Sequence, residues 1–367
     1  MMKSKISFAF AILAFLFISY NSFSIPRNHV MEFSTGTWCG FCPCGELVAD
    51  SIINVYPNTV IVGYHSGGND PFVFSEATTI FNAIGYGASP TLCLDRSNHP
   101  GDPNHTYISY MMWSNFFYQR YLATPDALID VVITTKDYNT STRVLNATIN
   151  ATALQNLTGQ YKIHFELIEN FVVYPQNWYQ ACGNDSSGYH ANYVHRWIPR
   201  AIINGVSGQT LNTGGVWNQN QTITKSFSYT LSSAWVPGNC DFIAIVYKDS
   251  SAALYLSEVQ QAIRQSVTNP LGVSRQNQIP AQYSLAQNYP NPFNPTTNIK
   301  FSIPKDGNAS LKIYDILGNG IAVYLDGFVK AGTYNAEIDA SRWSSGIYFY
   351  KLTATGFTET KKMMLVK

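Results

Sequence analysis

The chain of 367 residues has few charged side chains and no excess of either sign. Asp, Glu, Lys and Arg make up 12% of the sequence, against ~25% in an average soluble chain, and the formal net charge is +1. A protein that binds nucleic acid or an anionic lipid surface needs a basic stripe, which this balance does not supply. We therefore expect no nucleic-acid partner and no electrostatic membrane binding.

Beyond its first residues the sequence contains no long apolar run. The run from Ile6 to Ile18 follows two lysines and leads to small residues that end at Ser24. This order is typical of a secretory signal peptide. The run is shorter than the ~20 apolar residues of a spanning helix, although a membrane anchor is the alternative interpretation. We predict a signal peptide over residues 1–24, export through the periplasm and no transmembrane segment in the mature chain.

The next hundred residues alternate between strand and helix patterns. "HVMEFS" predicts a strand, "CGELVADSIINVY" a helix and "NTVIVGYH" a second strand. A short helix, the strand "TLCLD" and a longer helix follow. Because such alternation favours an α/β layer, we assign residues 25–124 to an α/β domain.

From residue 125 onward the chain is rich in β patterns. Apolar and polar residues alternate in segments separated by Asn, Thr, Gly and Ser, which predicts a β-sandwich over residues 125–267. Residues 268–284 lack periodicity and are predicted to be a linker. Residues 285–367 read as a second, smaller β-sandwich. The expected fold is therefore an α/β domain followed by all-β, immunoglobulin-like domains.

Cysteine is scarce, yet three of the six cysteines lie in the segment "WCGFCPC". Cys39 and Cys42 form a CxxC pair where a strand meets a helix. A thiol at a helix N-terminus faces unpaired N–H groups and the positive end of the helix dipole, which favour the reactive thiolate. A cysteine one turn later lies on the same face and can resolve a mixed disulfide. We expect Cys39 to be the more exposed and more acidic thiol.

The same cysteines allow a second interpretation, a metal site. Cys39, Cys42 and Cys44 together with His65 offer thiolate and imidazole ligands that suit zinc or copper(I). However, the spacing CxxCxC is cramped for one tetrahedral ion, and exported chains readily form disulfides instead. We predict no metal and no other cofactor.

Two separated segments, "EFSTGTWCGFCP" and "GYGASPTLCLD", together resemble the thioredoxin superfamily. In that family a strand leads into WCxxC, and a loop that contains a cis-proline faces the cysteines. The resemblance implies that Cys39 attacks, that Cys42 resolves and that the Ser89–Pro90 peptide bond is cis. The site residues that it implies are Cys39, Cys42 and Pro90 for catalysis and Trp38, Ser89 and Thr91 for substrate binding.

Further residues extend or depart from the family pattern. Family members commonly carry a buried acid on the strand before the motif, and Glu32, one residue more distant than usual, is the candidate proton acceptor for the resolving thiol. Cys44 and Cys93 are additional cysteines that could pair with each other. Cys182 and Cys240 lie in the β-sandwich and are predicted to form a structural disulfide.

The C-terminal segments "NYPNPFNPTTNIKFSIP", "YDILGN", "SGIYFYKL" and "KKMMLVK" resemble type A sorting domains of the type IX secretion system. This resemblance covers residues 285–367 and implies passage through the outer membrane by that machinery. An ordinary immunoglobulin-like binding module is the alternative. The preceding thioredoxin-like and sandwich regions together resemble the outer membrane protein 28-related family, whose members are associated with the outer membrane.

Two functional hypotheses follow. The first is a secreted or cell-surface thiol-disulfide oxidoreductase or isomerase that acts on protein cysteines through the CxxC pair. The second is a non-enzymatic surface or adhesion protein in which the thioredoxin-like domain is a platform and its disulfide is structural. The reduction potential of the Cys39–Cys42 pair distinguishes them, because structural disulfides lie below about −300 mV.

Overall fold

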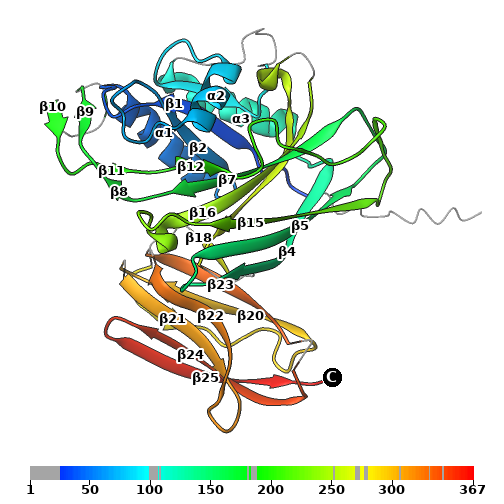
Figure 1. Ribbon diagram of the computed structural model, residues 1–367. Helices are drawn as coiled ribbons and strands as arrows, with labels where there is room; N and C mark the ends of the chain where they lie inside the picture. The colour runs from blue at the N-terminus through cyan, green and yellow to red at the C-terminus, as the bar shows by residue number, and fades with distance from the viewer. Residues whose placement is uncertain are drawn as a thin grey trace, which may run out of the picture.

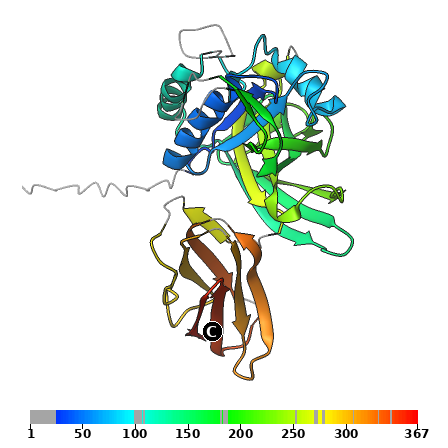
Figure 2. The same cartoon turned by 90° about the vertical axis from the view of Figure 1, so that its left-hand side faces the viewer.

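The computed structural model describes most of the chain after the predicted signal peptide, which lies outside the described residues. The described residues are 25–98, 106, 109–179, 182, 188–250, 253–268, 273–276, 280–305, 307–329, 331–340 and 343–367. The fold is mostly β and has several domains. Figure 1 shows the helices gathered at one end, two β-sheets in the middle and a further β module at the other end, and the turned view of Figure 2 shows the same order.

The N-terminal part is a three-stranded sheet with packed helices. Its elements are β1 (Val30–Thr35), α1 (Cys42–Val55), β2 (Val60–His65), α2 (Ser75–Ile84), β3 (Thr91–Leu94), the 3-10 helix η1 (Tyr110–Met112) and α3 (Trp113–Ala123). Strand β1 lies in the middle, parallel to β2 and antiparallel to β3. All its residues are buried, as expected for a strand that is covered on both faces. The predicted alternation of strands and helices is confirmed.

The middle part is a two-sheet β-sandwich, also as predicted. Its elements are β4 (Ile129–Tyr138), β5 (Val144–Ala153), β6 (Leu157–Thr158), β7 (Tyr161–Glu169), β8 (Val172–Val173), β9 (Gln176–Trp178), β10 (Gly188–His190), β11 (Val194–His195), β12 (Ile198–Ile202), β13 (Gln209–Thr210), β14 (Val216–Trp217), β15 (Thr222–Thr230), η2 (Pro237–Asn239), β16 (Cys240–Lys248), η3 (Leu254–Leu256) and β17 (Val259–Ser266). One sheet has the order β15-β5-β4 and the other β12-β7-β16-β17, with β13 beside β7.

The sheet of β7 and β16 is buried on both faces. On one face Phe165 and Phe242 pack into the core between the two sandwich sheets. On the other face Ile168 and Ile243 belong to the core of the N-terminal part, which also contains Met31 of β1. Because side chains alternate between the faces of a strand, one apolar run serves two cores. The N-terminal part and the sandwich therefore share a hydrophobic core.

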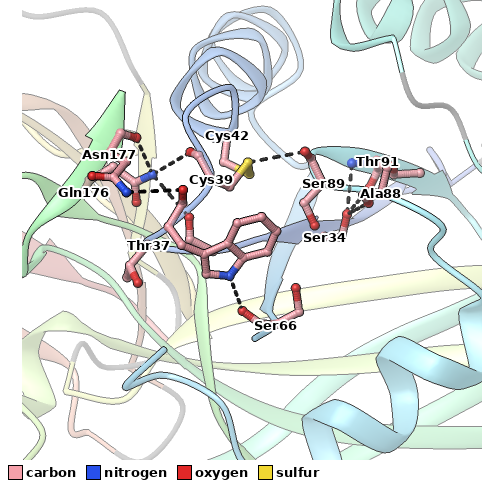
Figure 3. The surroundings of a disulfide bond; sticks show 12 residues. Ser34, Thr37, Cys39, Cys42, Ser66, Ala88, Ser89, Thr91, Gln176 and Asn177 are labelled. Atoms are coloured by element: carbon pink, nitrogen blue, oxygen red, sulfur yellow. Dashed lines mark hydrogen bonds between the residues drawn. A yellow bond between two sulfur atoms is a disulfide. The ribbon is translucent and has the colours of Figure 1, made fainter. Parts of the chain in front are cut away.

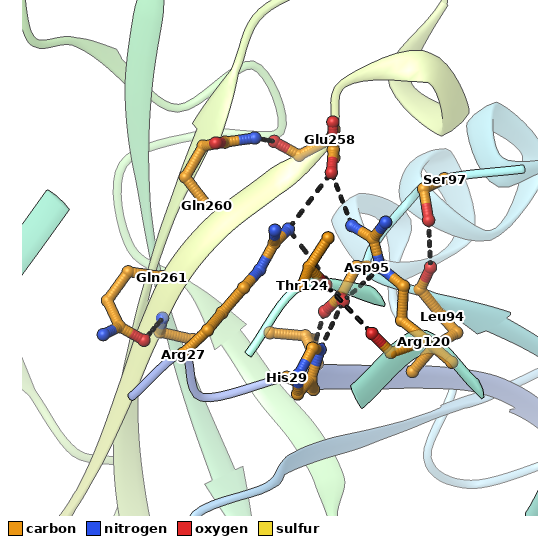
Figure 4. A network of polar contacts seen from close by, with 12 residues as sticks. Arg27, His29, Leu94, Asp95, Ser97, Arg120, Thr124, Glu258, Gln260 and Gln261 are labelled. Atoms are coloured by element: carbon orange, nitrogen blue, oxygen red, sulfur yellow. Dashed lines mark hydrogen bonds and ion pairs between the residues drawn. The ribbon is translucent and has the colours of Figure 1, made fainter. Parts of the chain in front are cut away.

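A buried network of charges fastens the same two parts together (Figure 4). Asp95 follows β3 and contacts His29 at 2.7 Å and Arg120 of α3 at 2.9 Å. Arg120 and Arg27 both also reach Glu258, which precedes β17 of the sandwich. These cations hold the pKa of Asp95 well below its usual range against the opposing effect of burial. The network joins the segment before β1, α3 and the sandwich.

The C-terminal module has a core of its own. Its strands are β18 (Val273–Gln276), β19 (Ser284–Leu285), β20 (Thr296–Ile303), β21 (Gly307–Tyr314), β22 (Gly320–Val329), β23 (Gly332–Asp339), β24 (Gly346–Ala354) and β25 (Phe357–Leu365). They form two four-stranded sheets, β18-β23-β20-β19 and β22-β21-β24-β25. Phe301, Leu311 and Tyr350 are fully buried between them.

The predicted linker needs a correction. Within residues 268–284, the four residues of β18 pair antiparallel with β23 of the C-terminal module. The segment contains a backbone ladder that its sequence pattern does not show, because backbone hydrogen bonds do not depend on alternating side chains. The sheet of the C-terminal module therefore begins at Val273, before the predicted boundary at Leu285.

Candidate functional site

The CxxC pair lies in the turn between the central strand β1 and helix α1. Cys39 and Cys42 form a disulfide with an S–S distance of 2.05 Å and a Cα–Cα distance of 5.4 Å. Helix α1 begins at Cys42, and Pro43 occupies its first turn, where no intrahelical N–H partner is lost. Cys39 precedes the helix, and its carbonyl oxygen accepts a hydrogen bond from the N–H group of Cys42 at 3.3 Å.

The proline loop faces this disulfide, as predicted (Figure 3). The Ser89–Pro90 peptide bond is cis, and the Sγ atom of Cys39 lies 3.3 Å from the carbonyl oxygen of Ser89. Ser34 of β1 holds the loop on both sides, because its hydroxyl donates to the carbonyl of Ala88 and accepts from the N–H group of Thr91. The structure thus brings Cys39, Ser89 and Pro90 together.

Two neighbouring residues shape the site. The indole of Trp38 is half exposed and donates from Nε1 to the carbonyl of Ser66 at 2.6 Å, so it lies beside the disulfide turn. Gly45 of α1 lets the helix approach the proline loop, because a Cβ atom there would lie 3.1 Å from Cβ of Pro90. Thr91 is fully buried and its N–H group is bound to Ser34, so the structure does not present it to a substrate.

A segment of the sandwich covers the disulfide turn, and sequence reasoning did not find it. Residues 176–179 donate hydrogen bonds to all five carbonyl oxygens of residues 36–40. The side-chain amide of Gln176 reaches the carbonyl of Cys39 at 2.8 Å, and Figure 3 shows Gln176 and Asn177 on the side of Cys39 opposite Ser89. The N–H group of Tyr179 donates to the carbonyl of Gly40 at 2.8 Å.

Both cysteines of the pair are nearly buried. Cys39 is 3% exposed and Cys42 is 1% exposed. The ring of Tyr179 lies directly on Gly40, where an added Cβ atom would meet it at 2.5 Å, and packs edge to face with Phe41. Cys39 is the more exposed of the two, as predicted, but both residues are nearly buried and a segment of another domain covers the turn that carries them.

The second disulfide also differs from the prediction. Cys182 pairs with Cys44 in the first turn of α1, with a Cα–Cα distance of 5.5 Å. Cys240 is a free, buried cysteine at the start of β16, and Cys93 is free and buried in β3. The predicted Cys182–Cys240 bridge and the Cys44–Cys93 pairing are both wrong, because the covering segment brings Cys182 across to the helix.

Glu32, the candidate proton acceptor, lies on the face of β1 that packs against the sandwich. Arg96 donates to both of its carboxylate oxygens, at 2.8 and 2.7 Å, and Tyr64 donates to one of them at 3.2 Å. Among the described residues, the hydrogen bonds and ion pairs of Glu32 go to these two groups and not to Cys42. Its contacts are those of a structural ion pair.

Another buried acid lies closer to the cysteines along the helix. Glu46 follows Cys42 by one turn of α1, is 2% exposed and accepts a hydrogen bond from the hydroxyl of Tyr193 at 2.9 Å. Burial raises the pKa of Glu46 to about 7, although the nearby cation of Arg196 opposes this shift. In the sequence, the four-residue spacing between Cys42 and Glu46 was the signal that could have indicated an acid near the cysteines.

The described residues contain no group of three or more His, Cys, Asp and Glu side chains that could hold a metal ion. Within the predicted set, the three cysteines are bound in disulfides and His65 contacts Asp70 at 3.0 Å. In the described part of the chain no helix has the length and apolar character that crossing a membrane requires.

Comparison with solved structures finds matches to this chain. HBP35 of Porphyromonas gingivalis has a TM-score of 0.54 and 17% sequence identity, with 94% of this chain and 99% of that chain covered. A domain of the outer membrane lipoprotein Omp28 from Porphyromonas gingivalis has a TM-score of 0.24 and 15% identity, over 39% of this chain and 91% of that chain. No curated protein matches the chain.

Two family models match the sequence. Residues 287–367 match the secretion system C-terminal sorting domain, within two residues of the predicted boundary. Residues 78–267 match outer membrane protein Omp28, a range that contains Ser89, Pro90 and Cys182 but not the CxxC pair. With its sorting domain, the chain is an exported protein associated with the outer membrane or the cell surface. Because the second match spans more than half of the sequence, the chain belongs to the outer membrane protein Omp28 family.

Proposed function

We propose that the protein is a thiol-disulfide oxidoreductase or isomerase and that residues 25–124 form a thioredoxin-like domain. The observation that carries the proposal is the 3.3 Å contact between Cys39 Sγ and the carbonyl of Ser89. A disulfide at the start of a helix, held against the backbone before a proline, can exchange with an extended cysteine-containing peptide bound at that backbone.

The residues take separate roles in this reaction. In the reduced protein, the thiolate of Cys39 attacks a substrate disulfide, and one substrate sulfur leaves as a thiol. Cys42, at the first position of α1, then attacks the mixed disulfide, reforms the Cys39–Cys42 bond and releases the second substrate thiol. The N-terminus of α1 favours the thiolate forms. Ser89 offers its backbone and Trp38 an exposed apolar surface to the substrate, while Thr91, bound to Ser34, holds the proline loop in place.

The availability of a reductant decides which direction of thiol-disulfide exchange is favoured. A protein outside the cell has no evident thiol donor that would return Cys39–Cys42 to the dithiol after each turnover. We therefore favour isomerisation, or oxidation by the reverse of these steps, over sustained reduction. In the oxidising direction a substrate thiolate attacks Cys39 of the disulfide and Cys42 leaves as a thiol, after which a second substrate thiolate displaces Cys39 and forms the substrate disulfide. Substrates are proposed to be exported proteins with paired cysteines, and the secretion machinery that reads the sorting domain is the other partner.

A non-enzymatic surface protein is the second candidate, and a specific observation favours it. Both cysteines of the CxxC pair are nearly fully buried, and residues 176–179 are bound to the turn that carries them. A permanently covered disulfide would only staple the turn between β1 and α1.

The reduction potential of Cys39–Cys42 separates these candidates. We expect a value above about −300 mV when the full chain is equilibrated with glutathione or dithiothreitol buffers and the thiols are counted by mass spectrometry. We also expect that Cys39→Ser reduces the isomerisation of a disulfide-scrambled protein to the uncatalysed rate. Cys240→Ser, which replaces a buried free cysteine, is the matched control. A lower potential together with full activity of Cys39→Ser would establish the structural role.

A further inference from the structure

The cover over the CxxC pair is held at two points of different chemistry. Residues 176–179 are bound to the turn by hydrogen bonds, which can open reversibly. Three residues after Tyr179, Cys182 is bound to Cys44 of α1 by a covalent bond. As long as this bond exists, the cover stays tethered to the helix that carries Cys42 and closes again after each local opening.

The two disulfides differ in access. Cys39 and Cys42 are both shielded by the cover, at 3% and 1% exposure. In the second disulfide Cys44 is 1% exposed, whereas Cys182 is only partly buried. Because Cys182 is the least buried of these four cysteines, we expect an external thiol to attack there before it attacks the CxxC pair.

The leaving group also favours attack at Cys182. Displacement at that sulfur releases Cys44, which lies in the first turn of α1, where the helix N-terminus favours a thiolate against the opposing effect of burial. The two free cysteines do not compete, because burial raises the pKa of both Cys93 and Cys240.

We propose that Cys44–Cys182 is a second thiol-exchange site that controls access to Cys39–Cys42. Its reaction partner is a thiol reductant, either a small molecule or a protein with two cysteines, which is needed once to release the cover and not in each turnover. One thiolate attacks Sγ of Cys182 and forms a mixed disulfide, while the S–S bond breaks and Cys44 leaves as a thiolate that takes up a proton. A second thiol of the partner attacks the mixed disulfide. Cys182 is released as a thiol, and the partner leaves as a disulfide.

This two-electron reduction removes the tether of the cover. Residues 176–179 then keep their hydrogen bonds to residues 36–40 and the packing of Tyr179 on Gly40 and Phe41, and local opening exposes Cys39 to thiols or substrates. The order of events is fixed by the structure: Cys44–Cys182 is reduced first and Cys39–Cys42 second. The inference goes beyond the proposed function, because it describes access to the disulfide whether or not that disulfide is catalytic.

The test is the order of reduction in the full chain. The oxidised protein is treated with dithiothreitol, samples are alkylated at intervals, and each cysteine is quantified by peptide mass spectrometry. We expect Cys44 and Cys182 to be alkylated about tenfold faster or more than Cys39 and Cys42, because the latter pair reacts only through the open state. Alkylation of Cys39 and Cys42 first, or of all four cysteines together, would overturn the proposal.

Two variants test the control itself. The double variant Cys44→Ser, Cys182→Ser should reduce its Cys39–Cys42 bond about tenfold faster than the wild type, since its cover is untethered. Gln176→Ala, which keeps the tether and removes one pair of hydrogen bonds to the turn, should give a smaller acceleration in the same direction. Tyr189→Ala is the matched control, because Tyr189 is exposed on the neighbouring strand β10 and should leave the rate unchanged.

The outcomes separate this inference from the proposed function. An unchanged Cys39–Cys42 reduction rate in the double variant would refute the control by Cys44–Cys182, whatever the activity of the protein. Ordered reduction combined with a Cys39–Cys42 potential below about −300 mV would leave this inference standing and remove the oxidoreductase. The wild-type order of reduction decides the matter even if a variant does not fold.

Discussion

The N-terminal part and the C-terminal module are attached to the β-sandwich in opposite ways. The three-stranded sheet of β1, β2 and β3 contributes to a hydrophobic core that it shares with β7, β16 and β17. The C-terminal module closes its own core between its own two sheets and contacts the sandwich through β22 and η2. A domain without a separate core depends on its neighbour to fold. The comparison thus predicts two units of stability, residues 25–267 and residues 273–367.

The shared interface contains a charged cluster as well as apolar side chains. Glu32 of β1 is bound by Arg96, and Tyr64 of β2 bridges Glu32 to Glu166 of β7 across the interface. All four side chains are fully buried. Removing one partner of a buried ion pair leaves the other charge uncompensated, which is far more costly than removing the whole pair.

The largest expected effect is therefore the loss of Arg96. We predict that Arg96→Met lowers the free energy of unfolding of residues 25–267 by about 3–5 kcal/mol, because the carboxylate of Glu32 loses its cation. Urea unfolding followed by tryptophan fluorescence measures this, since Trp343 is the one tryptophan of the C-terminal module in the sequence. The unfolding of residues 273–367 should not change.

Lys361→Met provides the matched comparison in the other unit. Lys361 pairs with Glu359 at 3.2 Å on the surface of β25, and exposed pairs contribute about 0–1 kcal/mol. If Arg96→Met also shifted the C-terminal transition, or left residues 25–267 as stable as before, the division into two units would be wrong.

A smaller effect concerns pH, and it again belongs to residues 25–267. Burial, assisted by the carboxylate of Glu32, raises the pKa of Glu166 to about 8, against the opposing cation of Arg96. The folded state then keeps a proton that the unfolded state releases above about 4.5. The free energy of unfolding therefore falls as pH rises towards 8, by at most about 1.4 kcal/mol per pH unit for one proton.

The pH window isolates this carboxyl group from its neighbour His164, which lies 3.2 Å from Glu166. Burial and, to a smaller extent, the cation of Arg96 lower the pKa of His164 to about 3. The stability that the neutral imidazole contributes is therefore lost only as pH falls below about 6.5. Between pH 6.5 and 8 we expect Glu166→Gln to abolish most of the slope. The carboxyl of Glu46 has a pKa of about 7. The variant Glu46→Gln should therefore change the slope only in the lower part of this pH window. An unchanged slope in Glu166→Gln would contradict the assignment.

The regions of the molecule also differ in how much of their structure could be predicted from sequence patterns. The strands and helices around the CxxC pair and the two-sheet sandwich were predictable from local periodicity. The cis peptide bond before Pro90 was implied by the resemblance of two separated segments to the thioredoxin superfamily. The disulfide partner of Cys182 could not be predicted in this way. Pairing Cys44 with Cys182 requires a segment 138 residues downstream to fold back over the turn, and no local pattern encodes that return. Strand β18 was missed because it pairs through its backbone at the edge of a sheet.

The smallest expected effect is the removal of the C-terminal module, and it tests the independence of the two units most directly. Deletion of residues 269–367 takes away β18 together with the sheet to which it pairs, so no strand is left without its partners. The hydrophobic core of residues 25–267 is untouched. We therefore expect its free energy of unfolding to change by less than about 0.5 kcal/mol, and the reduction rates of both disulfides to stay the same.

A second truncation, of residues 285–367 alone, sharpens this test because it retains β18 without β23. Its exposed, unpaired edge gives a route to association between chains, so we expect similar stability but a greater tendency to aggregate than after the longer deletion. In the native host both truncated chains should stay in the periplasm, since they lack the sorting domain. Normal surface display of either truncated chain would show that residues 25–267 contain a sorting signal of their own. Loss of stability in the longer truncation would show that contacts near β22 and η2 join the two units into one.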